Sequence, residues 1–146
     1  MLTGSEIDQR AAVIKEVMSW CGTPYKHQAD IKNIGCDCGM LLVRVFVDSG
    51  LLPPFDPRPY ANDWCLHKND EMYLRFVVER ASKVETPFFG DLVLFRHGRT
   101  YSHAGVVISW PYIVHASQPS GCVLMEDVEK SPFYQKPRMF FSFWKK

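Results

Sequence analysis

The sequence predicts an α+β domain in which N-terminal helices pack on a central antiparallel sheet of about five strands. Apolar residues recur at helical spacing in the first half of the chain. After Pro87 the chain changes to short segments rich in Val, Ile and aromatic residues, separated by turn-forming residues. Helices followed by a run of strands are typical of the α+β class. With 146 residues and 47% apolar content, we expect one domain, residues 1–146, with a sizeable core.

Three helices are predicted from apolar spacing and from the residues that end them. The first covers about residues 6–20 and is stopped by Gly22 and the Thr-Pro pair after it. The second covers residues 38–49, is largely apolar, and is closed by Gly50. A third helix is predicted between about residues 61 and 80. The helices therefore come before most of the sheet.

The strands are predicted where β-branched and aromatic residues cluster between turn signals. They cover residues 91–95, 103–109, 112–116, 122–126 and 138–144. A run of such strands after the helices predicts an antiparallel sheet.

Composition excludes several classes of protein. Lys and Arg total 17 against 16 Asp and Glu, and this net charge of +1 predicts no nucleic-acid partner and no basic membrane anchor. No apolar run approaches the roughly 20 residues of a membrane-spanning helix. The first ten residues lack the pattern of a secretory signal, so we expect synthesis in the cytoplasm without an ordinary cleaved leader.

Cys38 is the candidate nucleophile among five cysteines, an odd number that argues against a disulfide framework. It opens the second predicted helix, where unsatisfied backbone N–H groups and the helix dipole favour a thiolate. The same N–H groups can face an oxyanion when a thiolate attacks a carbonyl.

His103 and His115 lie on neighbouring predicted strands, where burying them requires polar partners. One interpretation makes them a hydrogen-bonded structural pair. The other makes one the base for Cys38 and the other the group that orients it, as in acyl transfer. His67 and His97 lie in polar contexts and are expected to be solvated.

Strand parity sets a condition on the histidine pair, because side chains alternate faces along a strand. With a plain two-residue loop at residues 110–111, His115 would pair with Val106, which points away from His103. The two histidines share a face only if the loop is odd-numbered or a bulge intervenes, and Gly105 is the predicted bulge site.

Five motifs occur in consistent order between residue 10 and about residue 120: WCGTPYKHQ, GCDCG, GDLVLFR, SHAGVVI and IVHAS. In this combination the chain resembles the NlpC-type cell-wall cysteine peptidases, which have a reduced papain-like fold. The His-Gln pair after Pro-Tyr, and the two cysteines that flank Asp37, resemble a phage-associated branch of that family.

The resemblance implies roles for particular residues. Cys38 matches the nucleophile, His103 the general base and His115 the residue that orients the base. The positions that match substrate-contacting residues of the family are Tyr25, Asp37 and Ser102. The implied reaction is hydrolysis of γ-D-glutamyl to diamino-acid bonds in peptidoglycan stem peptides, without a cofactor, and phage tail proteins are further implied partners.

The sequence departs from the family at two places. Gly39 and Met40 follow Cys38, where the family usually has Ser-Gly. His27 and Gln28 replace glycines that often follow the Pro-Tyr pair, and we expect His27 at the rim or in a structural role.

Two alternatives to a hydrolase remain open on the sequence. Cys36 and Cys38 with His103 and His115 supply four ligands suited to zinc, although Cys-x-Cys is a less common spacing than Cys-x-x-Cys. The fold could also serve as a non-catalytic binding or assembly module, for example in a phage tail. The route to the cell wall, by virion tail, lysis or another export path, also remains open.

Overall fold

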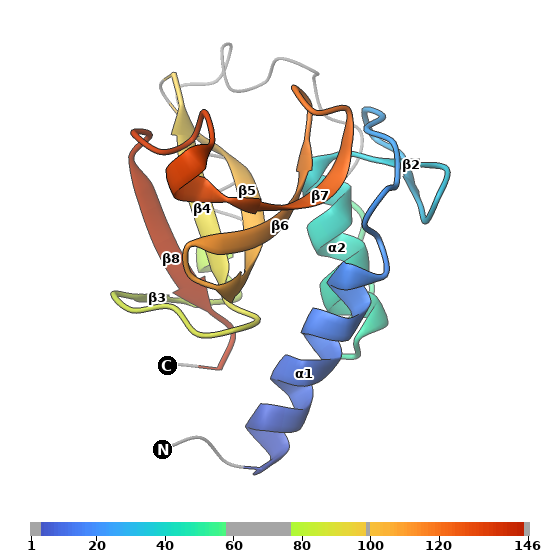
Figure 1. Ribbon diagram of the computed structural model, residues 1–146. Coiled ribbons are helices and arrows are strands. Elements are labelled where there is room, and N and C mark those ends of the chain that lie inside the picture. The colour runs from blue at the N-terminus through green and yellow to red at the C-terminus, as the bar shows by residue number, and fades with distance from the viewer. Residues whose placement is uncertain (1–3, 58–76, 99, 145–146) are drawn as a thin grey trace.

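The computed structural model describes residues 4–57, 77–98 and 100–144. Figure 1 shows the long helices lying beside a curved sheet. The elements, in chain order, are α1 (Gly4–Met18), β1 (Asp30–Ile31), β2 (Gly35–Cys36), α2 (Cys38–Asp48), β3 (Ser82–Val84), β4 (Leu92–His97), β5 (Thr100–Ser109), β6 (Tyr112–Ser117), β7 (Cys122–Asp127), the 3₁₀ helix η1 (Val128–Lys130) and β8 (Arg138–Ser142).

The main sheet has six strands in the order β3-β8-β4-β5-β6-β7, and every neighbouring pair is antiparallel. The α+β class is therefore confirmed, with one strand more than the sequence predicts. The additional strand, β3, pairs with β8 at the edge of the sheet. Its three residues, Ser-Lys-Val, carry no readable alternation, so its pairing with β8 defines it.

The predicted helices agree closely with the structure. α1 covers residues 4–18 and α2 covers 38–48, against predictions of 6–20 and 38–49. The predicted third helix lies mainly outside the described residues. Of its range the structure describes residues 77–80, of which Val77 and Val78 are helical. No helix in the described ranges has both the length and the apolar content to cross a membrane.

The sheet buries residues on both faces. The helices cover one face, where Val13 of α1 and Leu41 of α2 join Ala104 and Val106 of β5 in the larger core cluster. The opposite face holds a smaller cluster that includes Val107 and Phe133. Because side chains alternate along β5, His103 shares the second face with Val107 and contacts the Phe133 ring there.

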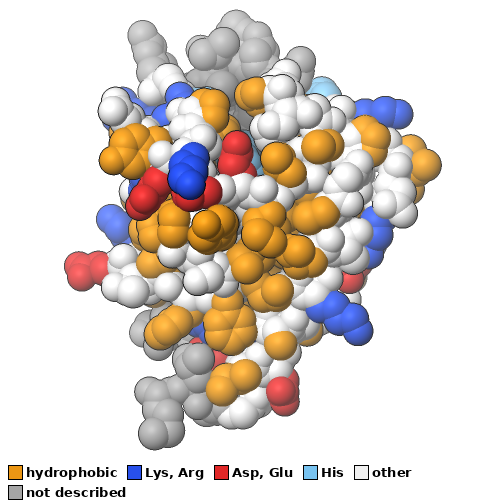
Figure 2. Space-filling view, viewed as in Figure 1, with side chains coloured by type: hydrophobic (Ala, Val, Ile, Leu, Met, Phe, Trp, Pro, Cys, Tyr) orange, Lys and Arg blue, Asp and Glu red, His pale blue; other side chains and the backbone are white. Residues whose placement is uncertain are grey.

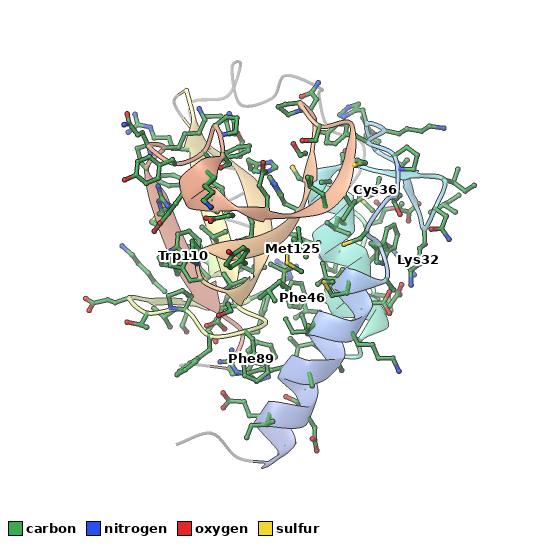
Figure 3. The ribbon with its side chains drawn as sticks, viewed as in Figure 1. Lys32, Cys36, Phe46, Phe89, Trp110 and Met125 are labelled. Atoms are coloured by element: carbon green, nitrogen blue, oxygen red, sulfur yellow. The ribbon has the colours of Figure 1, made fainter. Side chains whose placement is uncertain are left out.

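The helices leave part of the sheet uncovered. The face drawn in Figure 2 carries many hydrophobic side chains. Tyr112 on β6 and Met125 on β7 are both more than 40% exposed, and Figure 3 shows Met125 near the front of this face. Coverage by α1 and α2 therefore does not extend to this edge of the sheet.

Arg10 joins α1 to the sheet through a fully buried guanidinium. Its Nη1 lies 2.9 Å from Oδ1 of Asp91 and 2.8 Å from the carbonyl oxygen of Phe89. Its Nε donates to Glu6 at 2.9 Å, and the guanidinium carbon lies 4.3 Å from the centre of the Trp144 ring. A buried cation requires such partners, and here they come from three distant parts of the chain.

Candidate active site

Asp37 fixes the start of α2. Its backbone is extended, and its Oδ1 accepts a hydrogen bond from the N–H of Met40 at 2.9 Å, which caps the helix. Its Oδ2 accepts from the N–H of Gln28 at 2.7 Å, and Nδ1 of His27 lies 3.5 Å away. Both carboxylate oxygens therefore bind protein groups, and Asp37 holds the loop containing His27 against the start of α2.

Cys38, the first residue of α2, places its sulfur against β5. Its Sγ donates to the carbonyl oxygen of Ser102 at 3.8 Å, and the backbone N–H of Ala104 also interacts with the sulfur. These two residues flank His103. The nucleophile and the base that the sequence predicts are thus brought to the same point of β5.

The pKa of the Cys38 thiol is raised to about 12, first by burial and then by the negative charge of Asp37. The backbone N–H groups of Cys38, Gly39 and Ala104 act in the opposite direction, as expected at a helix start, but they are outweighed. The sequence-based expectation of a thiolate counted the helix N-terminus and not the burial, and burial acts against it.

His103 and His115 form a buried hydrogen-bonded pair. Nε2 of His103 lies 2.7 Å from Nδ1 of His115, and the ring planes are nearly perpendicular at 72°. Burial lowers the pKa of His103 well below its ordinary value, and repulsion from His115, His97 and Lys136 in their protonated forms lowers it further. Both rings are therefore neutral near pH 7.

A β-bulge gives the two histidines the same face. The β5–β6 register runs from Val107 opposite Ile113 to Ser109 opposite Tyr112, which leaves Ile108 as the extra residue. The parity condition is met, but the bulge lies at Ile108 and not at Gly105. A second bulge, between β4 and β5, leaves Ser102 unmatched just before His103.

Three further residues surround the pair and were not found from the sequence. Glu126 on β7 places Oε1 2.8 Å from Nε2 of His115. The Phe133 ring stacks on His103 at 4.8 Å and 14°. The ring of His97, a residue that the sequence predicts to be solvated, lies 5.7 Å from that of His103, edge-on, and His97 is half-buried there.

Tyr25 completes the surroundings of the thiol. Its backbone N–H donates to the carbonyl of Gly121 at 2.8 Å, which fixes its loop to the start of β7. The pKa of its hydroxyl is raised by burial and then by Cys38, Asp37 and Cys36, so the hydroxyl stays protonated beside the sulfur. Tyr25, Asp37 and Ser102 thus all lie around Cys38.

The four residues of the zinc hypothesis occupy different surroundings. Cys36 is fully buried in the larger core cluster and lies beside α2 in Figure 3. His103 and His115 bind each other. Within residues 4–57, 77–98 and 100–144, no three His, Cys, Asp or Glu side chains are placed to hold a metal ion.

A cysteine at the start of a buried helix, packed against a sheet that carries a histidine pair, defines a papain-like domain. The NlpC/P60 family model matches residues 22–141, which is most of the chain. The chain therefore belongs to the NlpC/P60 family. The phage-associated branch stays a prediction.

Relatives and solved structures agree with this assignment. The chain is 30% identical over 131 residues to "Murein DD-endopeptidase MepS/Murein LD-carboxypeptidase" of Escherichia coli, a match that covers 89% of this chain and 60% of that protein. The NlpC/p60 domain of the peptidoglycan hydrolase SagA superposes with a TM-score of 0.62 at 17% identity, covering 89% of this chain and 96% of that one. The peptidoglycan hydrolase RipB of Mycobacterium tuberculosis gives 0.64 at 17% identity, covering 99% and 70%. The two structures establish the fold, and the chain spans about three fifths of the Escherichia coli protein.

Proposed function

We propose that this chain is a peptidoglycan hydrolase that cleaves amide bonds in stem peptides, with Cys38 as nucleophile and His103 as base. One observation carries the proposal: Sγ of Cys38 contacts the backbone on both sides of His103. Because Nε2 of His103 is bound to His115, Nδ1 is the ring nitrogen left to exchange a proton with the thiol. The murein and peptidoglycan hydrolases among its relatives support the substrate class.

The raised pKa of Cys38 and the lowered pKa of His103 favour a neutral thiol and a neutral imidazole at rest. The thiol proton therefore moves to Nδ1 of His103 as Sγ attacks the amide carbon. Negative charge develops on the former carbonyl oxygen, within reach of the backbone N–H groups at the start of α2 and of the Tyr25 hydroxyl.

The intermediate collapses when His103 returns its proton to the leaving amine and the C–N bond breaks, which leaves a thioester on Cys38. His103 then accepts a proton from water as the water oxygen attacks the thioester carbon. The products are a carboxylic acid and the free thiol, and His115 supports the positive charge on His103 in both steps.

The bond proposed for cleavage is the γ-D-glutamyl to diamino-acid bond. The Escherichia coli relative is named a DD-endopeptidase and an LD-carboxypeptidase, which makes cross-linked and tetrapeptide stems the competing substrates. Digestion of defined monomeric and cross-linked muropeptides, followed by mass spectrometry, identifies the bond from the masses of the products.

The test of the mechanism compares Cys38→Ala with Cys21→Ala, a second partly buried free cysteine. We expect Cys38→Ala to lower the rate by about 10³-fold or more, and Cys21→Ala to leave it unchanged. Retained activity in Cys38→Ala would exclude the proposed nucleophile. If the unaltered protein binds muropeptides and cleaves none, the non-catalytic alternative replaces the hydrolase.

A further inference from the structure

We propose that Glu126 is a positioning residue that fixes the tautomer of His103 through His115. The proposal rests on the proposed function, since it concerns the base that acts on Cys38. The geometry is a chain of two contacts: Glu126 Oε1 to His115 Nε2 at 2.8 Å, and His115 Nδ1 to His103 Nε2 at 2.7 Å. Three neighbouring strands, β7, β6 and β5, each contribute one member.

The direction of these hydrogen bonds follows from the chemistry of the end group. An ionised carboxylate only accepts, so His115 must carry its proton on Nε2 and donate it to Glu126. In a neutral ring the other nitrogen, Nδ1, is then an acceptor. His103 must accordingly carry its proton on Nε2 and donate to His115. This leaves Nδ1 of His103 unprotonated, which is the state that a base for Cys38 requires.

Charge gives Glu126 a second effect on the pair. Three charged or titratable groups face the two rings: His97 of β4, Lys136 of the segment before β8, and Glu126 of β7. His97 and Lys136 both disfavour a proton on His103. Glu126 is the one carboxylate among the described residues that contacts either ring. Its negative charge raises the pKa of His115 against the lowering effect of burial. When His103 gains the thiol proton, Glu126 is the anion that balances it across His115.

Burial distinguishes this contact from an ordinary surface ion pair. The His115 side chain is fully buried, while the Glu126 side chain is 22% exposed. Without its acceptor, the buried imidazole of His115 has two possible tautomers. Only the tautomer protonated on Nε2 leaves Nδ1 of His103 unprotonated, as a base requires. The contact therefore affects the reaction through orientation and protonation, and not only through stability.

The first measurement does not depend on activity. In ¹⁵N-histidine-labelled protein carrying Cys38→Ser, imidazole nitrogen shifts should show His115 and His103 both protonated on Nε2 at pH 7.5. A His115 protonated on Nδ1 overturns the proposal, whether or not the protein is a hydrolase. Failure of the proposed function would instead appear as absent muropeptide cleavage with the tautomers as stated.

The second measurement uses variants at position 126. Glu126→Leu keeps a side chain of similar length and removes the acceptor, and we expect kcat to fall about 10- to 100-fold with KM unchanged. Glu126→Asp should recover part of this loss, because the charge remains and only the reach is shortened. An unchanged kcat in Glu126→Leu overturns the proposal.

The pH dependence of kcat/KM tests whether the charge of Glu126 acts on the histidine pair. Glu126→Gln removes the negative charge, so the pKa of the histidine pair falls and the ascending limb of kcat/KM moves to lower pH. Glu129→Gln removes a charge three residues away on an exposed position and should leave the limb in place. Equal shifts in the two variants would mean that only net charge matters, which overturns the proposal.

Discussion

Gly105 on β5 lies so close to His115 on β6 that a β-carbon at position 105 would stand 3.2 Å from the Cβ of His115. The same atom would stand 3.0 Å from Cδ1 of Ile113 and 3.3 Å from the carbonyl oxygen of Val114. Glycine therefore leaves the space through which the His115 ring reaches His103 diagonally across the strands. The His-x-Gly spacing in the sequence is thus a packing requirement of the histidine pair.

Gly105→Ala should disturb this pair. The added methyl presses on Ile113, His115 and the β6 backbone together, and overpacking of this kind costs about 1–3 kcal/mol of unfolding free energy. We expect a lower kcat on muropeptides together with a lower melting temperature. Gly4→Ala is the control, because a β-carbon there meets nothing within 4 Å. Unchanged kcat in Gly105→Ala would show that His115 tolerates displacement.

The helices and most of the sheet could be predicted because their signals are local. The apolar spacing within α1 and α2, and the Asp-Cys step at the start of α2, require no knowledge of distant residues. β3 could not be predicted, because its three residues become a strand only by pairing with β8. The bulge at Ile108 is likewise a property of two strands together, and the sequence placed it at Gly105.

The predicted site residues, Cys38, His103 and His115, carry motifs, and the structure groups them around residues 102–104 of β5. Phe133 carries no motif, since it reaches His103 from a segment 30 residues further along the chain. Glu126 could be found from the sequence only weakly, as a carboxylate two residues after Leu124, which pairs with His115. The raised pKa of Cys38 could not be read at all, because burial depends on the whole fold.

Phe133→Leu should shift the pH dependence of activity upward. The Phe133 ring covers one face of His103 and helps to exclude water, which lowers the pKa of that imidazole. A smaller side chain admits water, so the pKa rises toward its ordinary value and the ascending limb of kcat/KM moves to higher pH. This direction is opposite to that expected for Glu126→Gln. Tyr134→Leu, at an exposed neighbouring position, is the control.

The lowered pKa of His103 also predicts how the free energy of unfolding depends on pH. Below about pH 6.5 the unfolded chain protonates His103 while the folded protein does not, so the free energy of unfolding decreases as pH falls. Phe133→Leu, by raising the folded-state pKa, should make this decrease smaller. Urea unfolding between pH 5 and pH 8 measures the slope, and an equal slope in both proteins would contradict this account.

The Cys38 thiol should alkylate slowly at low pH. With its pKa raised to about 12, the thiolate fraction increases about tenfold per pH unit across the neutral range, and the rate with iodoacetamide should follow it. Mass spectrometry assigns the modified cysteine, and Cys38→Ala gives the background from the others. A rate that is already constant at pH 6 would instead indicate a thiolate–imidazolium pair at rest.

Arg10 and Arg44 offer a matched comparison of two arginine–carboxylate pairs. Arg10→Met leaves the carboxylate of Asp91, which is 1% exposed, without its cation, and breaking a buried pair in this way costs about 3–5 kcal/mol. Arg44→Met breaks a pair with Asp48 whose side chains are both about one-third exposed, which costs about 0–1 kcal/mol.

Chemical denaturation at pH 7.5 measures both losses. Arg10 contacts α1, the segment just before β4, and β8, and not the histidines, so the folded fraction of Arg10→Met should keep its kcat while its denaturation midpoint falls. Adding Asp91→Leu to Arg10→Met should restore part of the stability, because the unpaired buried charge is then removed. Equal losses for Arg10→Met and Arg44→Met would show that the buried cation contributes no more to the fold than a surface pair.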